Sequence, residues 1–238
     1  MKKAFLVNST LVIALSFVTN SITPVMAESQ VNSVAKHEVS KKLLRAKLAN
    51  LSFFSANFTQ DVVSEAGELL EQSSGKLAIS KPNLANWHTV EPDELAIVSD
   101  GSDVWFYNPW IEQVSVYSLS AAIAKTPILL LTSKDESLWQ QYTVYQEKTS
   151  QTKISQQDEH FVISAKDPNS QIKSLTLVFS TKAQQIQGSE LSQFSFLDAT
   201  GQISHIKLSN FDAQKVPENS LFNFVVPEGV QIDDQRAH

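Results

Sequence analysis

Histidine is the first side chain to consider for chemistry, because imidazole is both a common general base and the commonest metal ligand in proteins. The chain has five, at His37, His88, His160, His205 and His238. No two of them have the spacing that brings ligands together on one helix face or across a hairpin. Cysteine is absent, which excludes disulfides, thiolate zinc sites and a catalytic thiol. We therefore expect neither a metal nor a cofactor.

Carboxylates that could act in pairs occur in two places. Glu91, Asp93 and Glu94 share a proline-containing turn, and Asp233 and Asp234 are adjacent near the C-terminus. Paired carboxylates can hydrolyse glycosidic bonds, but charges in such positions are more simply solvated surface groups. The six dispersed glycines form neither a Gly-x-Ser-x-Gly motif nor a phosphate-binding loop. The sequence thus predicts a protein that is not an enzyme.

Aromatic side chains are concentrated on predicted strands instead. Trp87, Trp105 and Trp110 occur within one short stretch that also contains Tyr107 and Ile97. Most buried aromatic residues are structural. The pattern alone therefore favours a packed core over a ligand cavity.

Turn signals at regular spacing separate many short apolar–polar alternations, which is typical of a β-barrel or sandwich. The predicted helices are Val31–Asn50 and a short one from Ser120 that breaks at Thr126-Pro127 and leads into an apolar turn up to Leu131. The predicted strands are 54–63, 77–79, 95–98, 104–107, 112–119, 138–146, 161–165, 172–180, 184–196, 203–211 and 222–225. The expected class is mainly β with short helices (α+β), and no linker divides the chain.

The first 27 residues have the organisation of a secretory signal peptide. Lys2 and Lys3 precede an apolar segment centred on Leu11–Val18, and Val25-Met26-Ala27 offers small residues before a cleavage site. Residues 28–238 would then form a single domain with 17 basic and 25 acidic residues, a formal charge of −8. An acidic chain without a basic cluster is not expected to bind nucleic acid. The expected location is the periplasm.

The order of motifs between Gly75 and Gln113 resembles the outer-membrane lipoprotein carrier family of Gram-negative bacteria, LolA. Further matches are the Phe58-Thr59-Gln60 triplet and the Trp139-Gln140-Gln141-Tyr142 segment, and the likeness is weakest between 148 and 214. The ordered set comprises Gly-x-Leu at 75–77, Pro-Asn-Leu at 82–84, Trp87, Pro-Asp-Glu at 92–94, Ser-Asp-Gly at 99–101, Trp-x-Tyr-Asn-Pro at 105–109, Glu-Gln at 112–113, Thr126-Pro127, and Val226-Pro227-Glu228-Gly229.

This resemblance implies an incompletely closed antiparallel β-barrel covered by a helical lid, with lipoprotein acyl chains bound on the apolar concave face. It also implies that Lys81, where relatives commonly carry Arg, latches the lid through carbonyl groups of residues 126–131. A second departure is Ala85, where relatives carry Phe. The side chains that the resemblance places against the acyl chains are Phe54, Phe58, Leu77, Ile79, Leu84, Trp87, Ile97, Trp105, Tyr107, Ile128 and Leu129.

By the same resemblance, the protein is a monomeric periplasmic carrier. It takes outer-membrane-directed lipoproteins from an inner-membrane ABC transporter complex and passes them to an outer-membrane receptor lipoprotein. Two alternatives stay open. One is a lipoprotein-sensing regulator of the same fold, similar to RseB, although that type of protein has a second domain. The other is a periplasmic hydrolase on an unrelated barrel, which would need a nucleophile and base inside the cavity.

Overall fold

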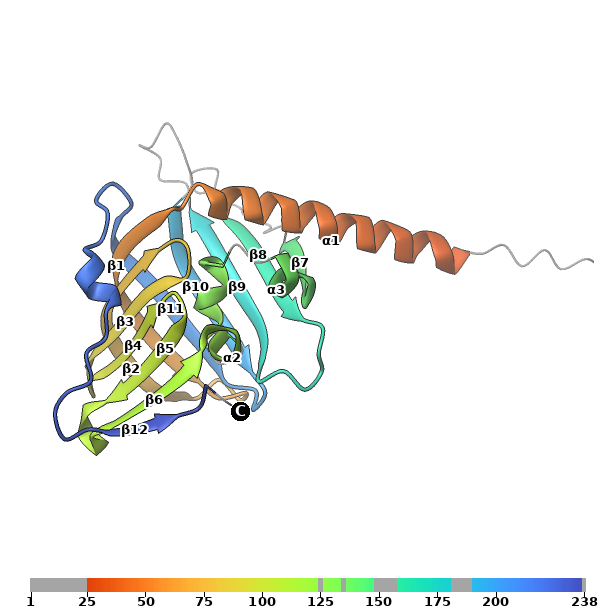
Figure 1. Ribbon diagram of the computed structural model, residues 1–238. Coiled ribbons are helices and arrows are strands. Elements are labelled where there is room, and N and C mark those ends of the chain that lie inside the picture. The colour runs from red at the N-terminus through yellow and green to blue at the C-terminus, as the bar shows by residue number, and fades with distance from the viewer. Residues whose placement is uncertain (1–24, 124–125, 134–135, 148–157, 181–189, 237–238) are drawn as a thin grey trace, which may run out of the picture.

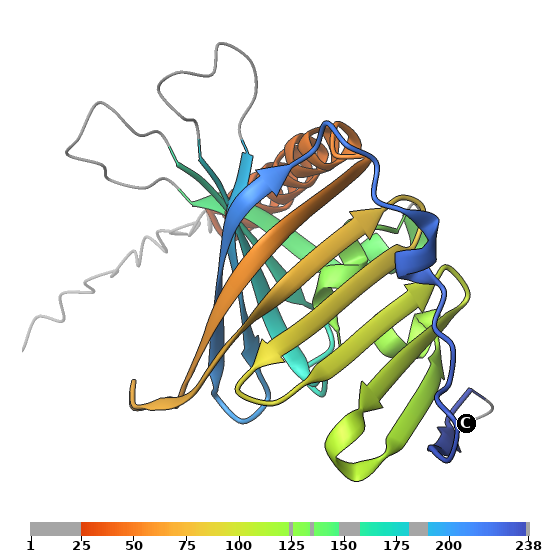
Figure 2. The ribbon, with the colours of Figure 1, turned by 90° about the vertical axis from the view of Figure 1, so that its left-hand side faces the viewer.

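A single strongly curved sheet of twelve strands dominates the computed structural model, which describes residues 25–123, 126–133, 136–147, 158–180 and 190–236 (Figures 1 and 2). The order across the sheet is β12-β6-β5-β4-β3-β2-β1-β11-β10-β9-β8-β7. The strands are β1 (Phe53–Val63), β2 (Leu69–Ser80), β3 (Leu84–Glu91), β4 (Leu95–Asp100), β5 (Asp103–Asn108), β6 (Gln113–Ser118), β7 (Tyr142–Glu147), β8 (Glu159–Ala165), β9 (Ile172–Ser180), β10 (Glu190–Asp198), β11 (Ile203–Asp212) and β12 (Gln231–Asp234).

Two antiparallel meanders make up this sheet, and β1 joins them by pairing with β11. Alternation along β1 buries Phe54, Ala56 and Phe58 while their neighbours stay partly or fully exposed, as expected for a strand with one face on a core. β12 and β7 are the outer strands and do not pair with each other, so the barrel is open. The expected incompletely closed barrel is confirmed, with one addition: β12 runs parallel to β6.

Helix α1 (Val25–Ala49) extends along one end of the sheet and packs on β7 (Figure 1). Leu44 and Leu48, one helical turn apart, are buried, so this face of the helix joins the core. The Ser40 hydroxyl accepts a hydrogen bond of 3.2 Å from the backbone N–H of Gln146 in β7. The helix therefore covers the backbone of an outer strand that would otherwise be open to pairing.

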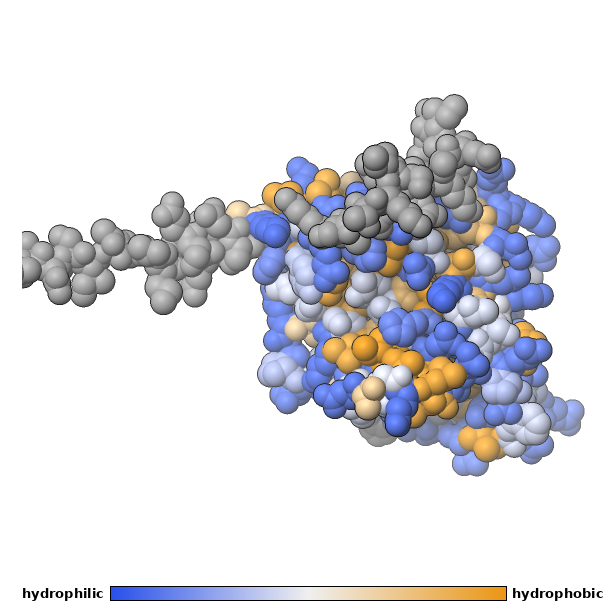
Figure 3. Space-filling view, turned by 180° about the vertical axis from the view of Figure 1, so that it is seen from behind, coloured by the Kyte–Doolittle hydropathy of each residue, from blue (hydrophilic) through white to orange (hydrophobic). Residues whose placement is uncertain are grey.

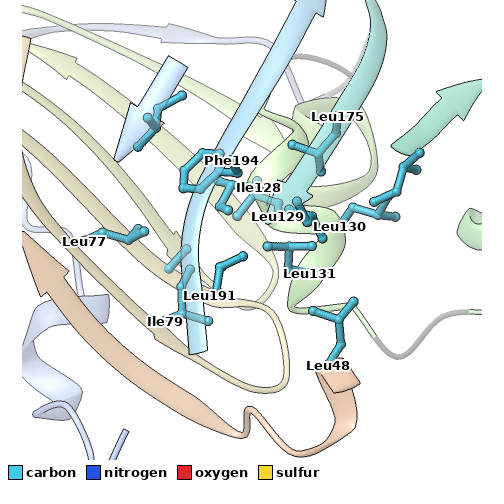
Figure 4. Close-up of a cluster of buried hydrophobic side chains, with 14 of the residues drawn as sticks. Leu48, Leu77, Ile79, Ile128, Leu129, Leu130, Leu131, Leu175, Leu191 and Phe194 are labelled. Carbon is cyan, nitrogen blue, oxygen red and sulfur yellow. The ribbon is translucent and has the colours of Figure 1, made fainter. Parts of the chain in front are cut away.

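Three short helical segments lie on the concave side of the sheet, as the lid prediction requires (Figures 1 and 2). They are α2 (Leu119–Ile123), the 3-10 helix η2 (Pro127–Leu131) and α3 (Glu136–Gln140). Their apolar side chains join the main core, and Leu129, Leu130 and Leu131 are at most 3% exposed. Figure 4 shows these leucines beside Leu175 and Leu191 of the facing strands.

The structure corrects the sequence prediction in several places. β3 and β12 were not among the predicted strands, and α1 begins at Val25 rather than Val31. The predicted strand from Leu138 begins instead as α3, and β7 starts only at Tyr142. Phe222–Val225 is not a strand, because it runs past the outer face of the sheet after the 3-10 helix η3 (Asn219–Phe222) without a pairing partner. Residues 184–189 of another predicted strand lie outside the described residues, as do residues 1–24 of the predicted signal peptide.

The outer face of the sheet is crossed by residues 213–230, here called the strap (Figure 2). Phe224 of the strap lies over Trp105 and Tyr107, with ring centroids 5.7 and 5.6 Å away. Asn86 donates a hydrogen bond of 2.6 Å to the carbonyl of Leu221. The strap thus gives the aromatic residues of this outer face a packing partner from the far end of the chain.

The strap continues into β12, and the next residues tie that strand to the sheet. Arg236 contacts Asp103 at 2.7 Å and Asp234 at 2.5 Å, and these carboxylates raise the pKa of the guanidinium. In the part of the chain that the structure describes, no helix has the length and apolar character needed to cross a bilayer.

Candidate ligand cavity

A cavity of about 330 Å³ lies between the concave face of the sheet and η2. This volume falls within the range typical of small-molecule sites. Its lining comes from β1–β5, β10, the turn between β3 and β4, and the lid: Gln60, Glu71, Ser73, Trp87, Thr89, Asp93, Glu94, Leu95, Ile97, Phe106, Asn108, Thr126, Ile128, Phe194 and Phe196.

Trp87 forms the aromatic floor of this cavity. Its ring lies 4.2 Å from that of Phe58 and 6.0 Å from that of Phe194, measured between centroids. The indole N–H donates a hydrogen bond of 3.2 Å to the hydroxyl of Thr89, so the only polar atom of the indole is already satisfied. The floor therefore presents carbon surface, which suits a hydrocarbon ligand.

Polar and acidic side chains surround the entrance. Glu71 comes from β2, and Asp93 and Glu94 come from the turn between β3 and β4. Glu94 accepts a 2.9 Å contact from His88, which lies on the outer face of β3. The cavity is therefore apolar inside and acidic at its rim, a gradient that favours an apolar ligand attached to a polar, non-anionic body.

The end of the lid is fastened to the turn between β2 and β3. The backbone N–H of Asn83 donates to the carbonyl of Thr132 at 3.4 Å, and the buried Thr132 hydroxyl donates to the carbonyl of Leu129 at 2.7 Å. These contacts use backbone groups, so a sequence motif could not have revealed them. They hold the end of η2 in addition to the apolar contacts that its buried side chains make with the core.

Lys81, in this same turn, donates a hydrogen bond to the carbonyl of Leu48 in the last turn of α1. It also lines a second pocket of about 310 Å³ together with Leu131, Ser133 and Trp139. Lys81 thus lies where α1 meets the end of the lid. The predicted latch to carbonyl groups of 126–131 stays a prediction.

The predicted site residues divide into three groups. Trp87, Ile97 and Ile128 line the cavity. Phe54, Phe58, Leu77, Ile79 and Leu129 belong to the buried cluster around it.

The third group, Leu84, Trp105 and Tyr107, lies outside the lining of this cavity, and its contact with acyl chains stays a prediction. Side chains alternate along a strand, and burial of Trp87 and of Val104 shows which face of β3 and β5 is inward. Leu84, Trp105 and Tyr107 have the opposite parity to these two. The sequence reasoning missed Phe106, whose inward direction is shown by its pairing with Ile97 across β4 and β5 in the structure.

Residues 49–225 match the model of the family described as "Outer membrane lipoprotein carrier protein LolA". The chain belongs to the LolA family. Two curated relatives carry the description outer-membrane lipoprotein carrier protein. One, from Shewanella sediminis (strain HAW-EB3), is 40% identical over 196 residues, which is 82% of this chain and 86% of the relative. The other, from Aeromonas salmonicida (strain A449), is 36% identical over 193 residues, 81% of this chain and 88% of the relative.

A solved structure supports the same fold. It is an uncharacterized conserved protein from Thermus thermophilus, with a TM-score of 0.51 and 14% sequence identity. The alignment covers 83% of this chain and 99% of that one. At this identity the likeness bears on the fold alone.

The second departure from the LolA pattern, Ala85, lies on the inner face of β3 and is 4% exposed. It pairs with Ile79 of β2 and Ser99 of β4 and belongs to the main core. An aromatic side chain at this position would have to share that inner face with Ile79. The alanine of this LolA-family chain therefore leaves the space beside Ile79 to other side chains of the core.

The aspartates with shifted pKa values serve turns rather than the cavity. Burial opposes ionisation of Asp100, but hydrogen bonds from the backbone N–H groups of Asp103 and Ser102 outweigh it and lower the pKa. The pKa of Asp212 is lowered in the same way by backbone donors. Among the described residues, no group of three or more His, Asp or Glu side chains is placed to hold a metal ion.

Ligand binding should be visible in the fluorescence of Trp87, because its indole forms the cavity floor. A variant that keeps only Trp87 should change its emission when a fatty-acyl ligand is added. Variants that keep only Trp105, which packs under Phe224, or only Trp110, which is 70% exposed, should not change.

Trp139 stands in a polar sequence context, Trp-Gln-Gln-Tyr, yet it is 3% exposed within the core. It lines the second pocket rather than the cavity. A response confined to Trp105 or Trp110 would contradict the cavity assignment.

Proposed function

We propose that this protein is a periplasmic carrier that binds the acyl chains of lipoproteins released from the inner membrane. The observation that carries the proposal is an apolar cavity whose floor is aromatic and whose cover is a run of buried leucines from the same chain. Binding of acyl chains, the role of this carrier family, would explain why the concave face is apolar although the chain as a whole is acidic.

The energetics of acyl transport explain the need for such a cover. Each methylene gains about 0.8 kcal/mol on leaving water, so a triacylated anchor would not cross an aqueous compartment unshielded. The carrier must also let the anchor go. If Leu129, Leu130 and Leu131 compete with the acyl chains for the concave face, part of the binding free energy is used to displace them, and the net affinity stays moderate.

In this proposal, the cavity of about 330 Å³ is smaller than the space that a bound acyl chain would occupy. Withdrawal of η2 would add the space that its buried side chains fill, and the backbone contact between Asn83 and Thr132 would be the first to break. In this proposal, η2 must leave the concave face before the acyl chains can occupy it.

For the route, we propose an inner-membrane ABC transporter complex as the donor and an outer-membrane receptor lipoprotein as the acceptor, with the carrier acting as a monomer. The predicted signal peptide over residues 1–27 belongs to this proposal. A regulator similar to RseB has no observation in its favour.

The test is release of lipoproteins from spheroplasts. Added protein should bring outer-membrane-directed lipoproteins into the soluble fraction as a one-to-one complex. Phe106→Asp, which places a charge in the cavity wall, should abolish release, whereas Val225→Asp, at a side chain 73% exposed on the strap, should not.

Thermal unfolding of both variants shows whether each still folds. Lipoproteins that stay in the membrane fraction with the unsubstituted protein in excess would refute the carrier assignment.

A further inference from the structure

The second pocket, of about 310 Å³, lies where the C-terminal end of α1 meets the end of the lid. It is called the junction pocket below. Its described lining comes from α1, the segment before β1, the β2–β3 turn and the lid region. It shares none of its described lining residues with the acyl-chain cavity. The two spaces can therefore be studied as separate sites.

The inner part of the junction pocket is apolar. Leu48 of α1, Leu131 of η2 and Trp139 of α3 line it, and each is at most 5% exposed. Figure 4 shows Leu131 close to Leu48. An indole with two leucines offers a surface for a small apolar body, and the volume of the pocket lies at the lower end of the range for small-molecule sites.

Four polar side chains line the same pocket, namely Arg45, Ser52, Lys81 and Ser133. Two of them are cationic, and none of the described lining residues is acidic. A guanidinium carries a planar fork of donors that fits a carboxylate or a phosphate, and ammonium and hydroxyl groups add further donors. Cationic donors beside an apolar floor are the composition expected for a site that binds an organic oxyanion.

Cations near the end of a helix also have a structural use, because the carbonyl groups there carry partial negative charge. Lys81 serves this use when it donates to the carbonyl of Leu48. That hydrogen bond does not explain why a second cation, two hydroxyls and a buried indole surround a space of this volume. Ala49 and Ser52 are exposed, so a ligand can enter the pocket from solvent.

We propose that the junction pocket binds a small organic oxyanion, a carboxylate or phosphate attached to an apolar body, and that this ligand favours the closed lid. Leu131 is the last residue of η2, and with Ser133 it supplies the lid side of the pocket. If η2 leaves the concave face to admit acyl chains, this side of the pocket moves and the oxyanion loses contacts.

A ligand stabilises the arrangement that it binds more tightly. The oxyanion and the acyl chains would therefore oppose each other although they occupy different spaces. Binding in the junction pocket stands on its own observations, whereas this opposition rests on the proposed carrier function.

Phenyl phosphate is a suitable probe, and the readout is the fluorescence of a variant that keeps only Trp139. Trp139 lines the junction pocket and Trp87 lines the cavity, so the two indoles report on different spaces. A buried reporter is needed, because Figure 3 shows hydrophobic patches on the surface where an aromatic probe can adsorb. Phenyl phosphate should change the emission of Trp139 in a saturable manner, whereas the uncharged benzyl alcohol should not.

Arg45→Met and Lys81→Met, made in the variant that keeps only Trp139, should each weaken phenyl phosphate binding about tenfold, because each removes a charge-assisted hydrogen bond. Lys81→Arg should retain most of the affinity. Lys42→Met is the matched control, since Lys42 is exposed on the same helix and does not line the pocket. Thermal unfolding shows whether each variant folds. Unchanged binding in both Arg45→Met and Lys81→Met would overturn the site.

The link with the lid is tested by the affinity of the unsubstituted protein for a fluorescent fatty acid at rising phenyl phosphate concentration. The apparent dissociation constant should rise several-fold and then level off, because coupling between two sites has a fixed limit. A rise without limit, accompanied by a response of a variant that keeps only Trp87, would place the probe in the cavity and overturn the separate site. A constant affinity would overturn the link with the lid.

Phosphatidylglycerol vesicles distinguish two sources of the oxyanion. A Trp139 response to vesicles that is reduced in Lys81→Met would support a lipid headgroup, and a response to phenyl phosphate alone would support a free small molecule. If the unsubstituted protein takes up no fatty acid, the carrier function fails, and the titration of Trp139 still decides whether the junction pocket binds an oxyanion.

Discussion

Leu130→Ala is expected to strengthen acyl-chain binding while it weakens the empty protein. Leu130 is 1% exposed in the lid, and removal of a buried leucine side chain costs about 2–5 kcal/mol. In the proposed loaded state this side chain has already left the concave face, so the loss falls mainly on the closed state. Acyl affinity should rise at least about tenfold, with a lower midpoint of thermal unfolding.

The control is Leu177→Ala in β9. Leu177 is 0% exposed, so its replacement by alanine removes the same buried side-chain atoms from the sheet instead of the lid. It should lower stability by a comparable amount without raising affinity for a fluorescent fatty acid. Equal affinity in Leu130→Ala and the unsubstituted protein would show that the lid does not compete with the ligand.

Gly75→Ala should destabilise the protein by about 3 kcal/mol or more, an unusually large effect for one methyl group. A Cβ at this position would lie 2.0 Å from the carbonyl oxygen of His88 in β3 and 2.8 Å from the ring of Phe58. Backbone and ring cannot both give way without separating β2 from β3 or tilting Phe58 away from Trp87. The cavity floor would change with the stability, so acyl binding should also fall.

Gly229→Ala separates this effect from the general cost of replacing glycine. Gly229 has a φ of 83° and no atom near its missing Cβ, so only the backbone penalty of about 1–2 kcal/mol applies. Urea unfolding of the two variants gives the comparison. Equal losses would mean that the contact with His88 and Phe58 relaxes at little cost.

Most strands could be predicted because turn residues mark their ends. Ile172–Ser180 was predicted with the observed bounds, and the short helix broken at Thr126-Pro127 was predicted as well. The 3-10 helix η2 begins at Pro127, because the fixed φ of proline suits the first position of a helix. Local chemistry was sufficient wherever glycine, proline or a regular alternation determined the backbone.

The direction of side chains in β5 could not be predicted, because Val104 to Tyr107 is apolar at every position. Alternation then carries no information about which face is inward. The choice depends on Phe224 of the strap, which packs on the outer pair, and on β4, which pairs Ile97 with Phe106. The contact with the strap is long-range in sequence, so a local pattern could not reveal it.

The strand predicted at Phe222–Val225 failed for a related reason. Its alternation is real, since Phe222 is buried and Val225 is 73% exposed. However, the inward side chains pack on the outer face of an existing sheet rather than pairing at its edge. The hydrogen bond from Lys81 to the carbonyl of Leu48 could not be predicted, because α1 ends beside the lid only in the folded chain.

The placement of the lid in the chain has a consequence for folding. Residues 119–140 separate the meander β1–β6 from the meander β7–β11, and among the described strands the two meanders are hydrogen-bonded to each other only where β1 pairs with β11. That pairing closes a loop of well over a hundred residues and is expected to form late, because loop closure must precede the contacts that reward it. Until then both concave surfaces are open to water. The leucines of η2 lie in the segment that connects the two meanders in the sequence. The segment that acyl chains would later displace is therefore also the nearest apolar segment that can cover the concave surfaces during folding.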